Sequence, residues 1–409
     1  MMKKITAMLL ALVMVFALCA CSNDSDKKDD ANNKDVSNIK VGFIFLHDEN
    51  STYDLNFMNA AKEACKNLGL SESQYIFKNN VPEDQSCYEA AAELVDEGCD
   101  IIFADSFGHE EFMIQAAKEF KDVQFCHSTG TLAHTEKLDN YHNAFASIYE
   151  GRYLAGIAAG LKLNEMIANG DFTADEAKIG YVGAKPYAEV KSGYTSFFLG
   201  ARSVCPTVTM DVTFTGSWYD ETAEKEAATT LIKNGCKLIS QHADSMGAPT
   251  ACEFAGVPNV SYNGSTVKAC PNTFIVSSRI DWTPYYEYAI KAVMNGETID
   301  TDWTGTLATG SVVLTDVNEK AAAAGTAEAI ADAKAKLEDG SLKVFDITTF
   351  TVGGKQLDSY MADVDTDKDY TADTEVVKDG AFLESTYRSA PYFDVQIDGI
   401  TLLDTNFGS

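Results

Sequence analysis

The sequence predicts an α/β protein of two similar lobes, each a doubly wound parallel sheet with helices on both faces, joined by a hinge. Three pairs of segments carry this prediction: residues 40–44 (KVGFI) and 178–182 (KIGYV), residues 75–77 and a strand ending at Phe214, and residues 97–102 (EGCDII) and 234–239 (NGCKLI). The members of each pair lie about 137 positions apart, so the chain contains an internal repeat of a β-α-β-α-β unit.

In the first lobe, short apolar runs alternate with segments whose apolar residues recur at helical spacing. Residues 41–46 are a continuous apolar run that predicts a buried strand, and Phe57, Ala60, Ala61 and Ala64 then mark one face of a helix. In order, we expect strands at 39–46, 75–77, 100–104 and 122–126, alternating with helices at 54–68, 86–97 and 110–120.

The second lobe repeats this alternation, with a glycine after a predicted helix in each lobe, at Gly98 and Gly235. Glycine is common there because it takes the left-handed conformation at low cost. We expect strands at 178–183, 209–214 and 237–241, and helices at 188–202, 222–234 and 249–255. A connecting strand at 143–148 leads into a helix at 149–163, where Gly156 and Gly160 would permit close packing.

The order beyond Phe274 is harder to predict. We expect helices at 284–295 and 318–338, short strands near Val344 and Phe350, and an acidic segment from Met361 onward whose charges form a solvated surface. The predicted organisation is a lipoprotein signal peptide (1–20), a flexible tether (21–38), lobe 1 (39–144), lobe 2 (145–275), and a return segment with a C-terminal elaboration divided between the lobes (276–409).

The amino terminus has the pattern of an export signal. Lys3 and Lys4 precede an apolar run at residues 5–18, and Ala20 stands directly before Cys21. This resembles a bacterial lipobox, although a cysteine two positions before Cys21 is unusual, and an ordinary secretory signal is the alternative. We therefore expect Cys21 to be lipidated and to anchor the protein on the extracytoplasmic face of the cell membrane. The polar residues 22–38 suit a flexible tether.

Charge and cysteine usage exclude several partners. The formal net charge is −29, and loss of Lys3 and Lys4 with the signal makes the mature chain more negative still. Such a surface repels nucleic acid and anionic lipid, so anchoring must come from acyl chains. The cysteines after Cys21 form no CxxC pair and no Cys/His cluster with metal spacing, so we expect mostly free core thiols and no metal site.

The loops after the strands are where a small ligand could bind, because the carboxyl ends of such parallel strands border the cleft. These loops combine aromatic rings with hydrogen-bonding groups, which suits a flat ligand stacked between rings with donors and acceptors at its edge. They are residues 47–54 (HDENSTYD), 105–109 and 127–130 in lobe 1, and residues 183–187, 217–220, 242–247 and 262–265 in lobe 2.

Signals of catalysis are weak by comparison. The chain has no GxSxG, GxxxxGK[ST] or HExxH motif, and no GxGxxG after a strand. Cys126 precedes His127, but adjacent residues of a strand point to opposite faces, so we interpret them as a buried thiol beside a cleft imidazole. We likewise interpret His242 and Asp244 as hydrogen-bonding loop residues. The sequence therefore predicts a binding protein without enzymatic activity or cofactor.

Several segments also resemble a known family: residues 106–108 (SFG), 127–130 (HSTG), 149–156 (YEGRYLAG), 199–203 (LGARS) and 241–245 (QHADS). They are similar to the basic membrane protein (BMP) family, substrate-binding lipoproteins of ABC importers that include purine nucleoside receptors. The resemblance covers roughly residues 39–350. It implies a type I periplasmic-binding-protein fold, no catalysis, and often a purine nucleoside held between two aromatic side chains.

The same resemblance assigns site residues. Tyr53 takes the place of the family's first stacking ring, in a loop where Asn50, Thr52 and Asp54 replace its acidic residue, serine and asparagine. Trp218 would supply the second ring. Asn263 falls where the nucleoside receptors have a ribose-binding aspartate, and their ribose-binding lysine has no counterpart, with Arg279 the nearest cation. These departures put ribose recognition in question and leave a nucleobase or another heterocycle as a ligand.

The predicted ligand-binding residues are Asn50, Thr52, Tyr53, Asp54, Ser106, Phe107, His127, Trp218, Asp244, Gly247 and Asn263. The predicted function is that of a monomeric, hinged receptor that closes on a purine nucleoside or nucleobase and delivers it to an ABC permease. One alternative is a ligand-sensing lipoprotein that presents a sugar or other heterocycle to a signalling receptor. Another is a surface adhesin or degenerate enzyme on the same scaffold.

Overall fold

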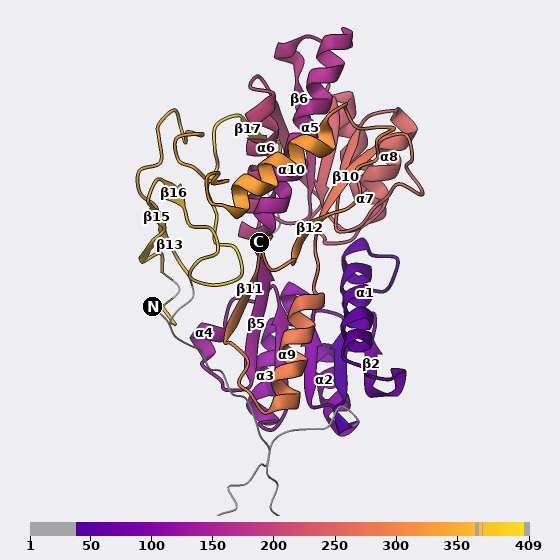
Figure 1. Ribbon diagram of the computed structural model, residues 1–409, viewed down its shortest axis with the longest axis vertical. Coiled ribbons are helices and arrows are strands. Elements are labelled where there is room, and N and C mark those ends of the chain that lie inside the picture. The colour runs from indigo at the N-terminus through magenta and orange to yellow at the C-terminus, as the bar shows by residue number, and fades with distance from the viewer. Residues whose placement is uncertain (1–37, 365–367, 370, 405–409) are drawn as a thin grey trace, which may run out of the picture.

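The computed structural model describes residues 38–364, 368–369 and 371–404, which form two lobes stacked along the long axis of the molecule (Figure 1). The predicted signal peptide, Cys21 and all but the last residue of the predicted tether lie outside the described residues. Each lobe is built on one sheet, of six strands in lobe 1 and seven in lobe 2.

The sheet of lobe 1 has the order β11-β5-β4-β3-β1-β2, and all of its neighbouring strands are parallel. Its strands are β1 (Val41–Ile44), β2 (Tyr75–Lys78), β3 (Ile101–Ala104), β4 (Gln124–Ser128), β5 (Tyr141–Ala146) and β11 (Asp302–Gly305). Its helices are α1 (Thr52–Asn67), α2 (Gln85–Asp96), α3 (Glu110–Glu119), α4 (Ala133–Glu136) and α9 (Thr283–Asn295). Every residue of β1 is buried, as expected for a central strand covered on both faces.

The sheet of lobe 2 has the order β12-β10-β9-β8-β6-β7-β17, in which only β12 is antiparallel to its neighbour. Its strands are β6 (Lys178–Gly183), β7 (Thr209–Phe214), β8 (Leu238–His242), β9 (Asn259–Tyr262), β10 (Phe274–Ile280), β12 (Val312–Leu314) and β17 (Ile400–Leu402). Its helices are α5 (Ile148–Asn169), α6 (Ala188–Val204), α7 (Glu221–Lys233), α8 (Gly247–Ala255) and α10 (Thr326–Glu338).

The predicted internal repeat is confirmed by the strand order. The five strands β5-β4-β3-β1-β2 of lobe 1 correspond one by one to β10-β9-β8-β6-β7 of lobe 2. The chain crosses between the lobes after β5, after β10 and between β11 and β12. The first crossing follows Ala146, because β5 continues in lobe 1 to that residue, and the predicted limit of lobe 2 at residue 275 falls inside β10.

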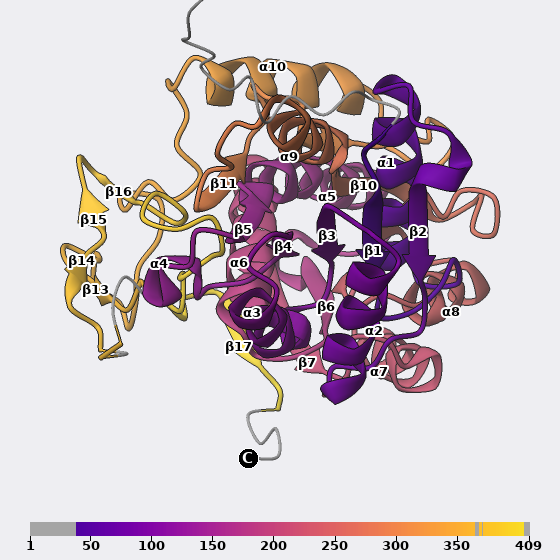
Figure 2. The same ribbon diagram turned by 90° about the horizontal axis from the view of Figure 1, so that it is seen from below.

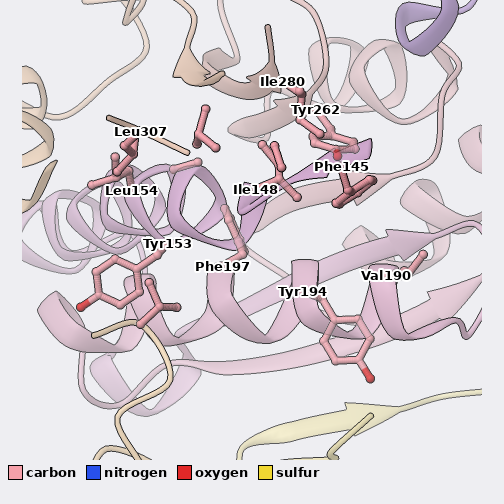
Figure 3. Close-up of a cluster of buried hydrophobic side chains, with 14 of the residues drawn as sticks. Phe145, Ile148, Tyr153, Leu154, Val190, Tyr194, Phe197, Tyr262, Ile280 and Leu307 are labelled. Atoms are coloured by element: carbon pink, nitrogen blue, oxygen red, sulfur yellow. The ribbon is translucent and has the colours of Figure 1, made fainter. Parts of the chain in front are cut away.

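Helices α5 and α6 pack closely enough for their backbones to touch, and their apolar side chains join those of neighbouring strands, such as Phe145 and Tyr262, in the core shown in Figure 3. A Cβ atom added to Gly156 would lie 2.0 Å from the carbonyl oxygen of Phe197, and one added to Gly160 would lie 2.4 Å from that of Ala201. Gly200 of α6 approaches the carbonyl oxygen of Tyr153 equally closely, at 2.0 Å. The close packing predicted for Gly156 and Gly160 is therefore confirmed.

Two predictions beyond Phe274 were wrong. The helix expected at 318–338 begins only at Thr326, because Gly325 before it has a φ of 80° that a continuing right-handed helix excludes. In the described part of the chain there is no strand at Val344 or Phe350, whose side chains are instead buried in the core. Apolar character alone did not distinguish these positions from strands.

The segment after Met361 contributes buried aromatic residues to the main core besides its solvated acids. Asp379 and Asp394 are exposed as expected, but the Phe393 ring stacks on Phe345 with 4.4 Å between centroids and lies 4.7 Å from Phe382. Short strand pairs join β13 (Met361–Ala362) to β14 (Thr374–Glu375) and β15 (Val377–Lys378) to β16 (Ala381–Phe382), and β17 extends the sheet of lobe 2 at β7. In Figures 1 and 2 this yellow segment lies along one side of both lobes.

The cysteines follow the prediction. All eight in the described chain are free and buried: Cys65, Cys87, Cys99, Cys126, Cys205, Cys236, Cys252 and Cys270. Among the described residues no cluster of His, Cys, Asp and Glu could hold a metal ion. No helix of this part of the chain has the length and apolar character needed to span a membrane.

Candidate ligand-binding site

The loops of the two lobes meet at one small cavity. Lobe 1 contributes Leu46, Tyr53, Ser106, Phe107 and Thr129, and lobe 2 contributes Glu189, Trp218, His242, Asp244 and Tyr262. These residues follow β1, β3 and β4 in lobe 1 and lie at or after β6 to β9 in lobe 2, because the carboxyl ends of both sheets face the cleft.

Tyr53 and Trp218 bring one ring from each lobe to the cavity. The Tyr53 hydroxyl donates to the carbonyl oxygen of Asp105 at 2.6 Å, which fixes the ring against its own lobe. The Trp218 ring contacts Tyr187 edge-on at 5.9 Å, and its Nε1–H is buried without a partner in the structure. A buried donor without a partner is costly, and a ligand acceptor within hydrogen-bonding distance of it would remove that cost.

Three ionisable groups of lobe 2 surround the cavity. His242 Nε2 lies 3.2 Å from Glu189 Oε1, and burial together with the charge of Arg152 lowers the pKa of His242 to about 4. The imidazole is therefore neutral at neutral pH. Burial and the nearby charges of Glu224, Asp54 and Glu189 raise the pKa of Asp244 well above its usual range. The site thus offers both acceptors and proton-bearing groups to a polar ligand.

Two segments that carry the family resemblance meet beneath the cavity. Arg152, from residues 149–156, lies 3.5 Å from the centre of the Tyr262 ring and donates from Nη1 to the carbonyl oxygen of Gln241 at 3.0 Å. Gln241 begins the segment 241–245, which places His242 and Asp244 in the cavity wall. The buried guanidinium therefore supports one ring and one loop of the site.

Five predicted site residues line the cavity: Tyr53, Ser106, Phe107, Trp218 and Asp244. Thr52 and Asn263 lie next to it. The backbone N–H and the hydroxyl of Thr52 both donate to the carbonyl oxygen of Asp244, at 3.1 and 3.0 Å, and Asn263 Nδ2 donates to the Asp244 carboxylate at 3.4 Å. Thr52 and Asn263 also line a separate groove outside the cavity.

The other four predicted residues do not reach the cavity. Asn50 is exposed and donates to Asp48, Asp54 is buried and accepts from the His47 N–H, and His127 Nε2 lies 2.6 Å from the Ser106 carbonyl oxygen. Gly247 begins α8, where an added Cβ would lie 2.3 Å from the Glu221 carbonyl oxygen. Their surroundings give them supporting roles, and their direct contact with a ligand stays a prediction.

Sequence reasoning missed Glu189, Tyr262, Thr129 and Leu46 as individual site residues. Glu189 lies in the first turn of α6, just past the loop 183–187 that we expected to border the cleft, so extending each loop by one helical turn would have found it.

Cys126 agrees with the prediction of a buried thiol, because burial raises its pKa to about 12, which disfavours the nucleophilic thiolate at neutral pH.

The lobes are closed on each other. Besides the Thr52–Asp244 bonds, Glu83 and Lys185 lie 4.0 Å apart across the cleft, and the rings of Phe107 and Tyr187 lie 5.3 Å apart. The cavity left between the lobes is about 20 Å³, room for roughly one water molecule. Drug-sized ligands need several hundred Å³, so the lobes must separate for a nucleoside to enter and be enclosed.

Buried carboxyls near the cleft predict an unusual pH dependence of stability. Burial raises the pKa values of Glu224, on α7 behind Asp244, and Glu384, bonded to Ser192, from 4.5 to about 7. Because these pKa values are higher in the folded protein than in the unfolded chain, each group contributes its full stabilisation below about pH 4.5. This contribution to the free energy of unfolding is lost as the pH rises through about 7. Since one unit of pKa corresponds to about 1.4 kcal/mol, each group costs up to about 3 kcal/mol at pH 8.

We therefore expect the free energy of unfolding of Glu384→Gln to rise relative to that of the wild type between pH 5 and pH 8, a difference in which the contributions of the buried histidines cancel. Urea unfolding at both pH values measures it. Glu111→Gln, at an exposed position of α3, serves as the control and should keep the wild-type pH dependence. An equal pH dependence in wild type and Glu384→Gln would show that Glu384 is ionised at no cost in the folded protein.

The fold and the cleft together define a type I periplasmic-binding protein. A solved ABC transporter solute-binding protein from Conexibacter woesei has this fold, with a TM-score of 0.61 and 20% identity over 75% of this chain and 98% of that chain. The sequence model of the Bmp family, described as ABC transporter substrate-binding protein PnrA-like, matches residues 43–344. The chain belongs to this family, whose members are extracytoplasmic solute-binding proteins and not enzymes.

Relatives in the family differ in the ligand that their names state. A purine-binding protein of Brucella abortus is 33% identical over 63% of this chain and 69% of its own length. A putative glucose-binding protein of an ABC transporter from Haloferax volcanii is 32% identical over 65% of this chain and 61% of its own length. The identities are too similar to choose between a purine and a sugar.

Proposed function

We propose that this protein binds a purine nucleoside or a related nucleobase in the cleft and delivers it to an ABC permease. The observation that carries the proposal is that Tyr53 and Trp218, from opposite lobes, line one cavity whose other walls hold hydrogen-bonding groups. Planar heterocycles gain from stacking on aromatic rings, while their edges need donors and acceptors. The name of the Brucella relative supports the same ligand class.

The ligand acts by favouring the closed state. In the open form it binds to the loops of one lobe, and closure adds the ring and polar groups of the other lobe, together with the bonds between Thr52 and Asp244. A ligand shifts such an equilibrium only by its additional contacts in the closed form. The closed form then presents both lobes together to the permease.

A sugar is the competing ligand, favoured by the name of the Haloferax relative. A thermal-shift screen of nucleosides, nucleobases and sugars separates the two classes. At about 100 times its dissociation constant, a ligand adds roughly 2.7 kcal/mol to the free energy of unfolding and raises the melting temperature. We expect purines to do this, and stabilisation by sugars alone would exclude the purine proposal.

Anchoring through Cys21 is part of the proposal. Its support is the small residue before Cys21 after an apolar run, and a formal net charge of −29 that repels anionic lipid and so leaves acyl chains to hold the protein at the membrane. Cell fractionation should recover the wild type with the membranes and a Cys21→Ser variant in the soluble fraction. Recovery of both in the membrane fraction would contradict lipidation at Cys21.

A further inference from the structure

A second hollow opens directly from the cavity. It measures about 250 Å³ and is walled by Phe107, Thr129, Tyr187, Glu189, Ala390 and Pro391, among others. We call it the side subsite. Three of these residues, Phe107, Thr129 and Glu189, also line the cavity between Tyr53 and Trp218, so the two spaces adjoin.

We propose that the side subsite binds an uncharged, mainly apolar substituent of the ligand, so that the protein selects substituted heterocycles over bare ones. The proposal rests on the proposed function for the identity of the heterocycle. It goes beyond it because one wall of the subsite comes from residues 388–391, which lie outside the part of the chain that matches the family model, residues 43–344.

The C-terminal wall is held firmly by lobe 2. Ser192 of α6 donates to the buried Glu384, Lys191 pairs with Asp394, and the Tyr194 hydroxyl donates to Gln396 at 3.1 Å. These three α6 residues follow directly after Ala188 and Glu189, which line the side subsite. Helix α6, which also carries Glu189, therefore keeps the wall in a fixed position relative to the cavity.

The same wall also contacts lobe 1 and has a fixed local shape. The backbone N–H of Ser389 donates to Asp302 Oδ2 of β11 at 2.8 Å. The Arg388 guanidinium turns back on its own segment and donates to the carbonyl oxygens of Ala390 and Pro391, each at 3.1 Å. The wall is therefore an ordered part of the closed cleft and not a loose loop beside it.

The conformation and burial of Thr129 independently indicate that a ligand binds where the cavity and the side subsite adjoin. This residue has a φ of 75°, which is rare and costly for a β-branched residue, and strain of this kind is concentrated at binding sites. Thr129 as a whole is only 3% exposed, and its hydroxyl has no partner in the structure. Since Thr129 lines both the cavity and the side subsite, a ligand that spans the two and carries a polar atom at their junction would satisfy this hydroxyl.

The surroundings hold Thr129 in its strained conformation. The Glu110 carboxylate accepts from the backbone N–H groups of Thr131 and Leu132 at 2.8 Å each, directly after Gly130. The backbone N–H of Thr129 donates to the Ala144 carbonyl oxygen at 2.8 Å, and a Cβ at Gly130 would lie 2.2 Å from Asn143 Nδ2, so only glycine fits beside Thr129. The buried hydroxyl of Thr129 is thereby kept at the junction of the two spaces.

The residues that line the side subsite determine which kind of substituent fits it. The Phe107 and Tyr187 rings lie 5.3 Å apart, and Ala188, Ala390 and Pro391 add apolar surface. The Glu189 carboxylate lines both spaces and opposes a phosphate, while the Arg388 cation is already engaged by two carbonyl groups. An alkyl or aryl group fits this chemistry, and a nucleotide does not.

Calorimetry with adenine and N6-benzyladenine tests the proposal. We expect the wild type to bind N6-benzyladenine at least tenfold more tightly than adenine, and to bind adenosine monophosphate more weakly than either. Ala390→Trp fills the side subsite and should abolish the tenfold preference while adenine affinity changes less than twofold. Thr386→Trp, at an exposed position of the same segment, is the matched control and should keep the preference.

The comparison of ligands in the wild type needs no variant to fold. Adenine bound as tightly as N6-benzyladenine would overturn the side subsite and leave purine binding standing. If no purine binds and glucose does, the proposed function is wrong. The side subsite is then tested by comparing the affinity for phenyl β-glucoside with the affinity for glucose. A phenyl glucoside bound no more tightly than glucose, or no binding in either series, would overturn it as well.

Discussion

Replacing Trp218 with alanine is expected to weaken ligand binding at least tenfold, or about 1.4 kcal/mol, without unfolding the protein. The ring lines the cavity and is only partly buried, so its loss opens little of the core. The variant loses the stacking surface of lobe 2 and the unpartnered Nε1–H. Isothermal titration with the ligand found by the screen gives the change in affinity.

Two further variants sharpen the test of Trp218. Trp218→Phe keeps a ring and removes the donor, so its affinity should lie between the wild type and Trp218→Ala. Phe254→Ala removes an aromatic ring of the same lobe that is 96% exposed and absent from the cavity walls, and should bind as the wild type does. Unchanged affinity in Trp218→Ala would remove this residue from the site.

Gly156→Ala is expected to destabilise the protein by about 1 to 3 kcal/mol, the usual cost of overpacking a core. In an isolated helix the same change would stabilise by nearly 1 kcal/mol, because alanine is the better helix former. The opposite sign is expected because the new Cβ would lie 2.0 Å from the Phe197 carbonyl oxygen, a backbone atom that cannot move aside without shifting α6.

Urea unfolding of Gly156→Ala, monitored by circular dichroism, measures this loss. Gly200→Ala, on the facing helix, should behave in the same way because its Cβ would lie 2.0 Å from the Tyr153 carbonyl oxygen. Gly264→Ala is the control: its nearest contact would be an ordinary 3.8 Å to Thr52. A Gly156→Ala protein as stable as the wild type would mean that α5 and α6 separate at little cost.

The sequence predicted the fold well because both copies of the repeat contain the same short sequence patterns. Apolar runs such as residues 41–46 and the glycines after helices, Gly98 and Gly235, occur in both lobes, and each pattern reflects the conformational preference of a short segment. The same reasoning failed for residues 318–325, where alanines of high helix propensity precede a left-handed glycine, Gly325. The left-handed conformation of Gly325 sets where α10 begins, and alanine propensity alone does not reveal it.

The predicted site residues that line the cavity lie in a loop at the carboxyl end of a strand or in the first turn of the helix that follows. Tyr53, Ser106, Phe107, Trp218 and Asp244 all meet this condition and all line the cavity. Asn50 is in the same kind of loop but points to solvent and donates to Asp48. Position in a loop therefore selects candidates, whereas the conformation of the loop decides which side chains face the ligand.

By itself, then, the sequence determined two β-α repeats, their strand-end loops and the aromatic residues within them, because these depend on neighbouring residues in the chain. Only the tertiary structure decided that Glu189, Tyr262 and Thr129 face the cavity, that Thr52 bonds to Asp244 across the lobes, and that residues 388–391 wall a side subsite. The physical reason is that these contacts join segments far apart in the chain, and their geometry is fixed by how whole lobes pack and close.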